Sequence, residues 1–344
     1  MHFQVVNPFD YPDWNEQLAS LGDASFFNTV EWARVLSETY GYEPCYLVGR
    51  EGGELVSLLP MMHVNSWLTG NRGVALPFSD YCEPVGLDLR HVGLVLDSLK
   101  ALGRRKTWRY FEIRSDIGVE RGCPASAVYR KHSLDLTGGE QALSGRLESS
   151  VRTSIRKAIK EGVEVTFSRS LEAVGEFYGL NCLTRRRHGV PPQPFSFFRN
   201  LQQQVLARGL GEVAIARQGG IVIAASVYCH AGRRVLFKYG ASDSRYQRLR
   251  GSTLVMWEAI RRYAREGYTH LSLGRTSGDN EGLLRFKTGW GAEESELRYF
   301  KYNFQSDRFV GGGPGHSEPG YRLVRMLPLS CSRLIGKVLY KHMA

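Results

Sequence analysis

Two stretches of this chain repeat one another at a distance of 167 residues, and this repeat constrains the fold more than any other feature. Residues 45–61, CYLVGREGGELVSLLPM, and residues 211–228, GEVAIARQGGIVIAASVY, each read as an alternating strand, an Arg-x-Gly-Gly turn and a second apolar strand. Paired glycines supply the positive φ angles that a tight hairpin needs. Two such hairpins in one chain predict a duplicated domain.

The residues around each hairpin predict the rest of each domain. After the second hairpin come a strand ending near Gly240, a helix over 251–267, a strand at 268–274, a short helix at 280–290 and a strand at 296–304. In the first half, helices are expected over 29–41 and 92–106 and a strand over 108–115. The predicted core faces are Trp32, Val35, Leu36 and Tyr40 on one helix, and Leu254, Trp257, Ile260 and Ala264 on another. The fold class is therefore α+β, with a central mixed sheet flanked by helices in each domain.

Composition divides the chain further. The expected segments are a first domain at 1–148, a second at 149–305, a Gly/Pro-rich linker at 306–320 and a basic amphipathic tail at 321–344. The tail has two interpretations: a final helix docked on the body of the protein, or a helix lying on an anionic membrane surface.

Charge is distributed unevenly between the halves. Residues 1–150 carry 14 Lys+Arg and 19 Asp+Glu, whereas residues 151–344 carry 31 and 15. This basic half indicates an anionic partner such as a nucleotide, a nucleic acid, a phosphorylated carrier or a lipid surface, although a merely soluble basic surface is the competing interpretation. Six scattered cysteines disfavour a zinc site or a disulfide framework, and no apolar run is long enough for a membrane span. With no signal peptide apparent, the expected location is the cytoplasm, with peripheral contact at the inner membrane face.

The stretch RTSIRKAIKEGVEV, residues 152–165, joins the predicted domains. Arg152, Arg156 and Lys160 recur every four residues, which places a basic strip on one side of a helix. Ile155 and Ile159 are expected to pack that helix, and 163–165 alternate like a strand. The strip is either an ordinary solvated face or a clamp for the phosphates of an acceptor.

Four segments together resemble the FemAB-type branch of the GNAT acyltransferase superfamily. They are RTSIRKAIKEGVEV, LTRRRHGVPPQPFSFFRNL, KYGASDSRYQRLRGSTLVMWEAI and GLLRFKTGWGAEESELRYF. The resemblance covers about residues 25–305, and the tail is similar to FemAB-like proteins of exosortase and exopolysaccharide loci. It implies two tandem GNAT-like domains and an N-acyltransferase that moves an acyl or aminoacyl group onto an amine of a cell-envelope peptide or sugar precursor. The implied donor is acyl-CoA or aminoacyl-tRNA, and no metal or permanently bound cofactor is expected.

The resemblance also implies a donor site at the start of the helix over 251–267. GNAT enzymes hold the CoA pyrophosphate on backbone amides at a helix N-terminus. The matching residues here are Arg248, Arg250, Gly251, Ser252 and Thr253. Thr253 departs from the family pattern, which has Gly or Ala there. The alternative is that Ser252 or Thr253 simply caps the helix.

Further site residues follow from the same resemblance. Lys287, in RFKTGWG, corresponds to a lysine at the catalytic centre of Fem-type enzymes and would stabilise charge on the acyl carbonyl or the donor phosphate. The competing interpretation is a lysine stem that covers aromatic surface. Tyr239 and Asp243 are further catalytic candidates. The residues predicted to bind the acceptor, a phosphate-bearing small molecule or lipid-linked precursor, are Arg152, Arg156, Arg275 and Trp290.

One departure from the family pattern leaves a second function class open. Relatives commonly carry an acidic residue in the strand before Gly-Arg, whereas this chain reads Ser272-Leu273-Gly274-Arg275. Together with Thr253, this favours a rival hypothesis, a catalytically inactive duplicated GNAT scaffold that binds RNA or an envelope-assembly partner. The basic second half favours a tRNA donor, and the partial Arg248–Gly251 motif favours acyl-CoA.

Overall fold

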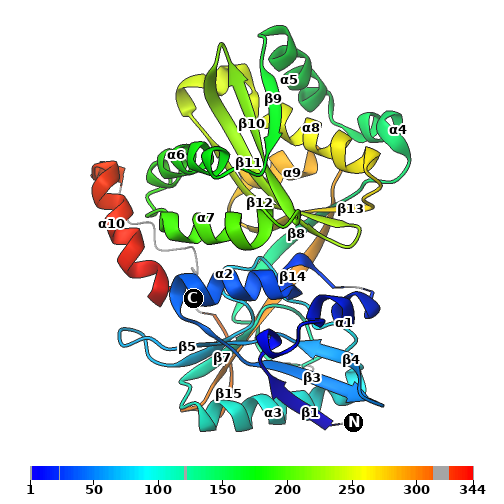
Figure 1. The fold of residues 1–344 in the computed structure, drawn as a ribbon, viewed down its shortest axis with the longest axis vertical. Helices are drawn as coiled ribbons and strands as arrows, with labels where there is room; N and C mark the ends of the chain where they lie inside the picture. Colours follow the sequence, from blue (N-terminus) through cyan, green and yellow to red (C-terminus); the bar gives the residue numbers. More distant parts are fainter. Residues whose placement is uncertain (1, 23, 120–121, 313–324, 344) are drawn as a thin grey trace. The chain divides into compact units, whose positions relative to one another are not determined.

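The computed structural model describes residues 2–22, 24–119, 122–312 and 325–343. It divides into two compact units (Figure 1). The first contains residues 1–129, 296–318 and 339–344, and the second contains 130–295 and 319–338. The chain passes between them within strand β8 (Ala127–Asp135) and again within β14 (Glu293–Asn303). Each unit is therefore made of separate segments of the chain. The sequence predicted domain boundaries at 148 and 305 instead. Sequence periodicity marks where a strand begins and ends, but it does not show that one strand belongs to two units.

The first unit contains two sheets. Three strands form the order β1–β3–β4, and a second set runs β2–β5–β6–β7 and continues into β14. Their bounds are β1 His2–Val6, β2 Glu43–Pro44, β3 Tyr46–Glu51, β4 Glu54–Leu59, β5 Met62–Val64, β6 Arg72–Val74 and β7 Tyr110–Ile113. The helices are α1 Trp14–Ser20, α2 Val30–Tyr40 and α3 Val92–Arg105. All four residues predicted as the core face of α2 are buried, which confirms that prediction.

The second unit is built on one sheet. Five of its strands follow the order β13–β12–β11–β10–β9, antiparallel except for the parallel pair β12–β13, and β8 adjoins β13 in the same sheet. Their bounds are β9 Glu164–Ser168, β10 Gly211–Gln218, β11 Ile221–Ala231, β12 Arg234–Ser242 and β13 His270–Ser277. The helices are α4 Gly139–Arg146, α5 Ser149–Lys160, α6 Leu171–Arg187, α7 Phe195–Leu201, α8 Gly251–Arg265 and α9 Glu281–Thr288. The mixed α+β class predicted from the sequence is confirmed.

Both predicted hairpins form. β3 and β4 meet at Gly52 and Gly53, with φ of 59° and 91°, and β10 and β11 meet at Gly219 and Gly220, with φ of 55° and 79°. Residues with side chains adopt such angles at a cost, so the glycines are what allow two-residue turns at these points. The repeated motif therefore has the same backbone geometry in both units.

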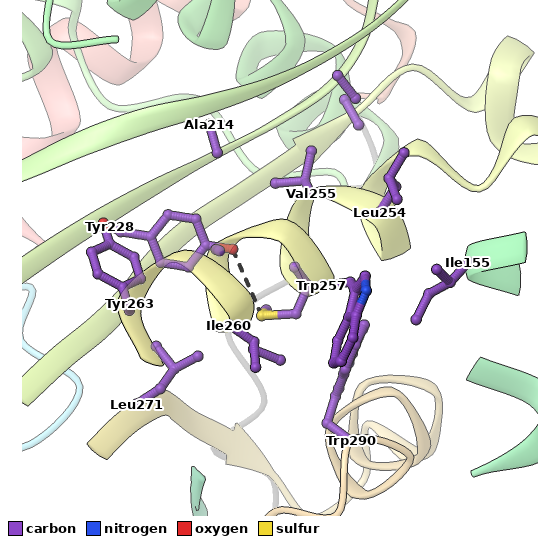
Figure 2. Packing of buried hydrophobic residues seen from close by; sticks show 14 of the residues in the cluster. Ile155, Ala214, Tyr228, Leu254, Val255, Trp257, Ile260, Tyr263, Leu271 and Trp290 are labelled. Carbon is purple, nitrogen blue, oxygen red and sulfur yellow. Dashed lines mark hydrogen bonds between the residues drawn. The ribbon is translucent and has the colours of Figure 1, made fainter. Parts of the chain in front are cut away.

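The sheet of the second unit is covered on both faces. Six successive residues of β10 are buried, and alternate side chains of a strand point to opposite faces. Ala214 and Ala216 join a cluster with Val255 and Trp257 of α8, part of which is shown in Figure 2. Aromatic rings from α6 and α7 pack on β12 through Tyr239, which lies outside that cluster. Because β10 is covered on both faces, the middle of its sequence is an unbroken apolar run and does not alternate with polar residues.

In helix α5, one of the two isoleucines predicted to pack is exposed. Ile155 is buried as predicted, but Ile159 is 58% exposed. The buried stripe passes through Ile155 and Ala158, and the partly buried Val151 packs at its start. Ile159 follows Ile155 by four residues, which is slightly more than one helical turn. It therefore lies outside the buried stripe, on the exposed side.

The C-terminal segment is partly described. β15 (Arg308–Val310) pairs with β14 inside the predicted linker, and residues 313–324 lie outside the described residues. Helix α10 (Leu329–Leu339) packs on the second unit, where Gly336 approaches the carbonyl oxygen of Pro192 so closely that a Cβ would not fit. None of the helices in the described part of the chain has both the length and the apolar character that crossing a bilayer requires.

Candidate active site

The turn before α8 has an open helix start. Arg250 adopts a left-handed conformation, φ 58° and ψ 28°, and α8 begins at the next residue, Gly251. Within the described residues no side chain caps this helix, and its first turn contains no acidic residue. The first amides of a helix lack intrahelical partners and carry the positive end of its dipole. Ser252 and Thr253 lie inside the first turn, so the alternative that one of them is the cap residue is wrong.

Gly251 lies where α8 approaches β11 closely. A Cβ at this position would lie 2.9 Å from Cδ1 of Ile223 and 3.3 Å from Cβ of Ala224. Such contacts force a neighbour to shift. The glycine of the predicted donor motif therefore has a packing role independent of any ligand.

Asp243 lies at the start of the same turn. Its backbone N–H donates to the carbonyl of Ile223 at 3.0 Å, and its carboxylate accepts from the backbone N–H of Arg245 at 2.9 Å. The Arg245 guanidinium donates to the same carboxylate at 2.6 Å, and these hydrogen bonds hold the pKa of Asp243 below its ordinary value. A carboxylate with a lowered pKa is a weak base, so the geometry suits Asp243 to fixing the turn.

Lys287 is the most deeply buried cation of the predicted site. It lies on α9 with 2% of its surface exposed. Its Nζ donates to the backbone carbonyls of Gly274, at 3.0 Å, and Arg275, at 3.1 Å. Gly274 has φ of 69° within β13, and Ser272 Oγ accepts its N–H at 3.3 Å. This left-handed residue interrupts the alternation of the strand, which allows two successive carbonyls to face one ammonium group.

Ser272 therefore has a structural place in this chain. It stands at the position where the family resemblance implied an acidic residue, and its hydroxyl supports the distorted strand that holds Lys287. The serine is compatible with the lysine site, although it supplies no carboxylate.

His132, near Lys287, and its partner Glu294 are residues that the sequence reasoning missed. His132, on β8, is fully buried, and its Nε2 lies 3.2 Å from Oε2 of Glu294 on β14. Burial and then the positive charge of Lys287 lower the pKa of His132, which favours the neutral ring. The available signal was weak: His132 stands at an inward position of an alternating strand, 155 residues before Lys287.

Trp290 and Arg152 lie on two segments that contact one another near the end of α9. Trp290 is buried in the core cluster (Figure 2). Its ring centroid lies 5.9 Å from that of Phe286. The segment after α9 contacts the start of α5, because the N–H of Glu148 donates to the carbonyl of Gly289. Arg152 uses Nη1 to donate to the carbonyl of Leu147 at 2.6 Å.

Arg156 lies one turn further along α5. Its side chain is exposed, and in the described chain it has no hydrogen bond or ion pair. Of the predicted basic strip, Arg156 is thus the arginine whose guanidinium the protein leaves to solvent.

Tyr239 lies away from this group. In the pairing of β12 with β11, Phe237 is opposite Tyr228 and Tyr239 is opposite Val227, so Lys238 is an extra residue. Such a bulge turns the next side chain to the other face of the sheet. The hydroxyl of Tyr239 donates to Oε1 of Gln193 at 2.9 Å. The structure therefore groups Lys287 with Arg275, His132 and Glu294, but places Tyr239 in the aromatic layer of α6 and α7.

Comparisons with known proteins agree with this architecture. Residues 146–288 match the family model described as an acetyltransferase (GNAT) domain. A segment of 94 residues is 23% identical to UDP-N-acetylmuramoylpentapeptide-lysine N(6)-alanyltransferase of Weissella viridescens, and this match spans 27% of the chain and 28% of that relative.

Solved structures share the fold over most of the chain. The crystal structure of FemX superposes with a TM-score of 0.69 at 14% identity, covering 89% of this chain and 98% of FemX. A tandem GNAT protein from the clavulanic acid pathway gives a TM-score of 0.55 at 13% identity, covering 88% and 98%. The C-terminal domain of a putative lysylphosphatidylglycerol synthetase from Agrobacterium fabrum gives 0.54 at 13% identity, covering 85% and 93%. Residues 146–288 therefore match an acetyltransferase (GNAT) domain in sequence, and the chain shares its fold with FemX.

Proposed function

We propose that this protein is an N-acyltransferase that moves an acyl or aminoacyl group onto an amine of a phosphate-bearing cell-envelope precursor. The observation that carries the proposal is the open N-terminus of α8 within the matched acetyltransferase segment. Arg248 and Arg250 precede it, and its first turn has no acidic side chain. A diphosphate is the kind of group that such a helix start binds.

The remaining residues take roles consistent with their surroundings. In the proposed reaction the acceptor amine attacks the acyl carbonyl, the bond to the leaving thiol or ribose oxygen breaks, and the proton lost by the amine passes to that leaving group. Lys287 supplies a fixed positive charge for the oxygen that becomes negative in the transition state. Arg156 and Arg152 hold the acceptor phosphate, Arg275 and Trp290 shape its site, and Asp243 fixes the donor turn.

Two donors fit this chemistry, and the relatives favour each in part. The structure of the tandem GNAT protein of the clavulanic acid pathway was determined without AcCoA, and the Weissella relative is an alanyltransferase acting on a muramoylpentapeptide. We propose acyl-CoA as the first donor to test, because the helix start suits a pyrophosphate, and aminoacyl-tRNA as the second. A lipid-linked acceptor is part of the same proposal.

Native mass spectrometry with CoA, acetyl-CoA and longer acyl-CoAs tests the donor site. The variant is Ser252→Glu, because Ser252 is exposed in the first turn of α8. Its carboxylate would favour the helix dipole and repel phosphates, so binding should fall at least about tenfold without loss of stability. Ser252→Gln is the matched control of similar size, and it should bind like the wild type.

Each outcome has a defined meaning. Stoichiometric binding that only Ser252→Glu removes supports the acyl-CoA donor. Binding that resists Ser252→Glu would contradict this location for the site. A wild-type protein that binds no thioester would contradict the acyl-CoA version and direct the same comparison to aminoacyl-tRNA. If neither donor supports transfer, the inactive-scaffold hypothesis replaces the proposal.

A further inference from the structure

The loop between β5 and β6, in the first unit, presents an exposed tryptophan. Trp67 is 83% exposed and the adjacent Leu68 is 51% exposed. The other five tryptophans, all within the described ranges, are buried. A tryptophan left in water forfeits the burial that normally stabilises it, so an exposed Trp-Leu pair marks a surface made for contact.

This loop is held in one conformation. Ser66 Oγ accepts the backbone N–H of Thr69 at 2.9 Å, and the carbonyl of Ser66 accepts the N–H of Gly70 at 2.7 Å. These two bonds close a compact turn around Trp67 and Leu68. The two apolar side chains are therefore presented by an ordered turn, so little entropy is lost when they bind.

The C-terminal residues support the same turn. His342 is buried, its Nδ1 lies 2.8 Å from Ser66 Oγ, and its carbonyl accepts from Nη2 of Arg72 at 2.8 Å. The ring of Trp67 packs edge-on against that of His342, with centroids 5.4 Å apart. The flanking Lys341 and Met343 are exposed. The end of the chain thus adds a cation and a thioether beside the tryptophan.

The charged side chains that reach or flank the turn itself, Arg109 and Lys341, are basic. Exposed Arg109 reaches the turn, with Nη1 3.5 Å from the carbonyl of Thr69, and Lys341 flanks it on the C-terminal side. Neither residues 62–74 nor residues 325–343 contain Asp or Glu. Tryptophan favours the headgroup region of a bilayer, and Lys and Arg beside it are attracted to anionic lipids.

We propose that Trp67 and Leu68, with Lys341, Met343 and Arg109, form a docking surface for an anionic membrane. Trp67 and Leu68 enter the headgroup region while the two cations contact lipid phosphates. This goes beyond the proposed transferase activity and does not depend on it. It would keep the protein at a surface on which a lipid-linked substrate is concentrated.

Vesicle binding tests this surface directly. The full-length protein is sedimented with phosphatidylcholine vesicles and with vesicles in which phosphatidylglycerol replaces part of that lipid, without donor or acceptor present. Binding should require the anionic lipid and weaken as salt is added. Because Trp67 is the exposed tryptophan, brominated phospholipids should quench its fluorescence, and Trp67→Ser should abolish that quenching.

Three variants make the test specific. Trp67→Ser should reduce vesicle affinity roughly tenfold, from the loss of one buried apolar side chain. Lys341→Gln should reduce vesicle affinity roughly fivefold, because it removes one cation that is attracted to the anionic lipid. Leu89→Ser, in the same unit, is the matched control, because Leu89 is 73% exposed but lies outside the turn. It should bind like the wild type.

Defined results would overturn the inference. Absence of vesicle binding, or binding unchanged in Trp67→Ser, would remove the membrane role from this turn. Equal binding to neutral and anionic vesicles would contradict the assignment of an anionic surface. Self-association in sedimentation velocity that Trp67→Ser abolishes would assign the turn to a second copy of the chain instead. Failure here leaves the transferase proposal standing, because no step of that reaction involves Trp67.

Discussion

The two units begin with the same hairpin but continue it differently. In the second unit, β11 pairs along its length with β12, so the hairpin becomes the centre of one sheet. In the first unit, β4 ends at Leu59, Pro60 follows, and β5 begins at Met62 in another sheet. Proline has no N–H to donate to a strand ladder. The comparison shows that one repeated motif can lead to one sheet or to two, depending on the residue that follows it.

The helix starts differ in a related way. Each unit has an Asp-capped 3-10 turn with an arginine two residues later: Asp88 with Arg90, and Asp243 with Arg245. In the first unit this turn runs directly into α3, through residues in right-handed conformation. In the second, Arg250 is left-handed and separates the turn from α8. A single change of backbone conformation therefore separates α8, but not α3, from the 3-10 turn that precedes it.

The largest difference should appear on removing a lysine from each unit. Lys287→Met leaves the carbonyls of Gly274 and Arg275 buried without this donor, so the free energy of unfolding should fall by about 2–4 kcal/mol. Lys106→Met breaks a partly exposed ion pair with Glu43 in the first unit and should cost less than about 1 kcal/mol. Urea unfolding measures both. Equal small losses would contradict the structural role assigned to Lys287.

Acid should weaken the second unit through His230. Burial lowers the pKa of His230 from 6.5 to about 4, so the folded protein resists a proton that the unfolded chain accepts. The stabilisation is complete above pH 6.5 and is lost as the pH falls toward 4, by at most about 3 kcal/mol. Urea unfolding of wild type and His230→Gln across this window isolates the effect. Parallel pH profiles for the two proteins would rule it out.

Alanine in the first turn of α8 and alanine in the first turn of α3 should have opposite effects on stability. Gly251→Ala forces Ile223 to move and should destabilise the second unit by about 1–2 kcal/mol. Gly93→Ala, in the first turn of α3, meets no atom within 4 Å and should stabilise the first unit by up to about 1 kcal/mol, since alanine favours helix. Thermal unfolding followed by circular dichroism measures both. Destabilisation by both variants would show that the two helix starts are packed alike.

Alanine in the hairpin turns should have equal effects. Gly53→Ala and Gly220→Ala both place a side chain at positive φ, and neither Cβ meets an atom within 4 Å. Each should cost about 1 kcal/mol, because backbone conformation alone decides the result. Chemical denaturation compares the two. A difference larger than the error would mean that the repeated turns are not equivalent.

Much of the fold was predictable because its signals are local. The paired glycines predicted both hairpins, and apolar spacing predicted α2 and α8. The prediction that Ile159 is buried was wrong for a local reason as well. A spacing of four residues is compatible with a position inside a buried stripe and with one just outside its edge. Local patterns left the unit boundaries unresolved, because β8 and β14 each contribute to both units.

The sequence by itself determined the repeat, the order of strands and helices, and the residue types available for a transferase site. Only the tertiary structure decided which of those residues meet. It placed His132 near Lys287 and Glu294 beside His132, and a bulge at Lys238 turned Tyr239 to the other face of the sheet. Periodicity reports how neighbours along the chain share a face, whereas a site depends on contacts between strands and helices far apart in sequence. Such contacts are fixed by the packing of the whole unit.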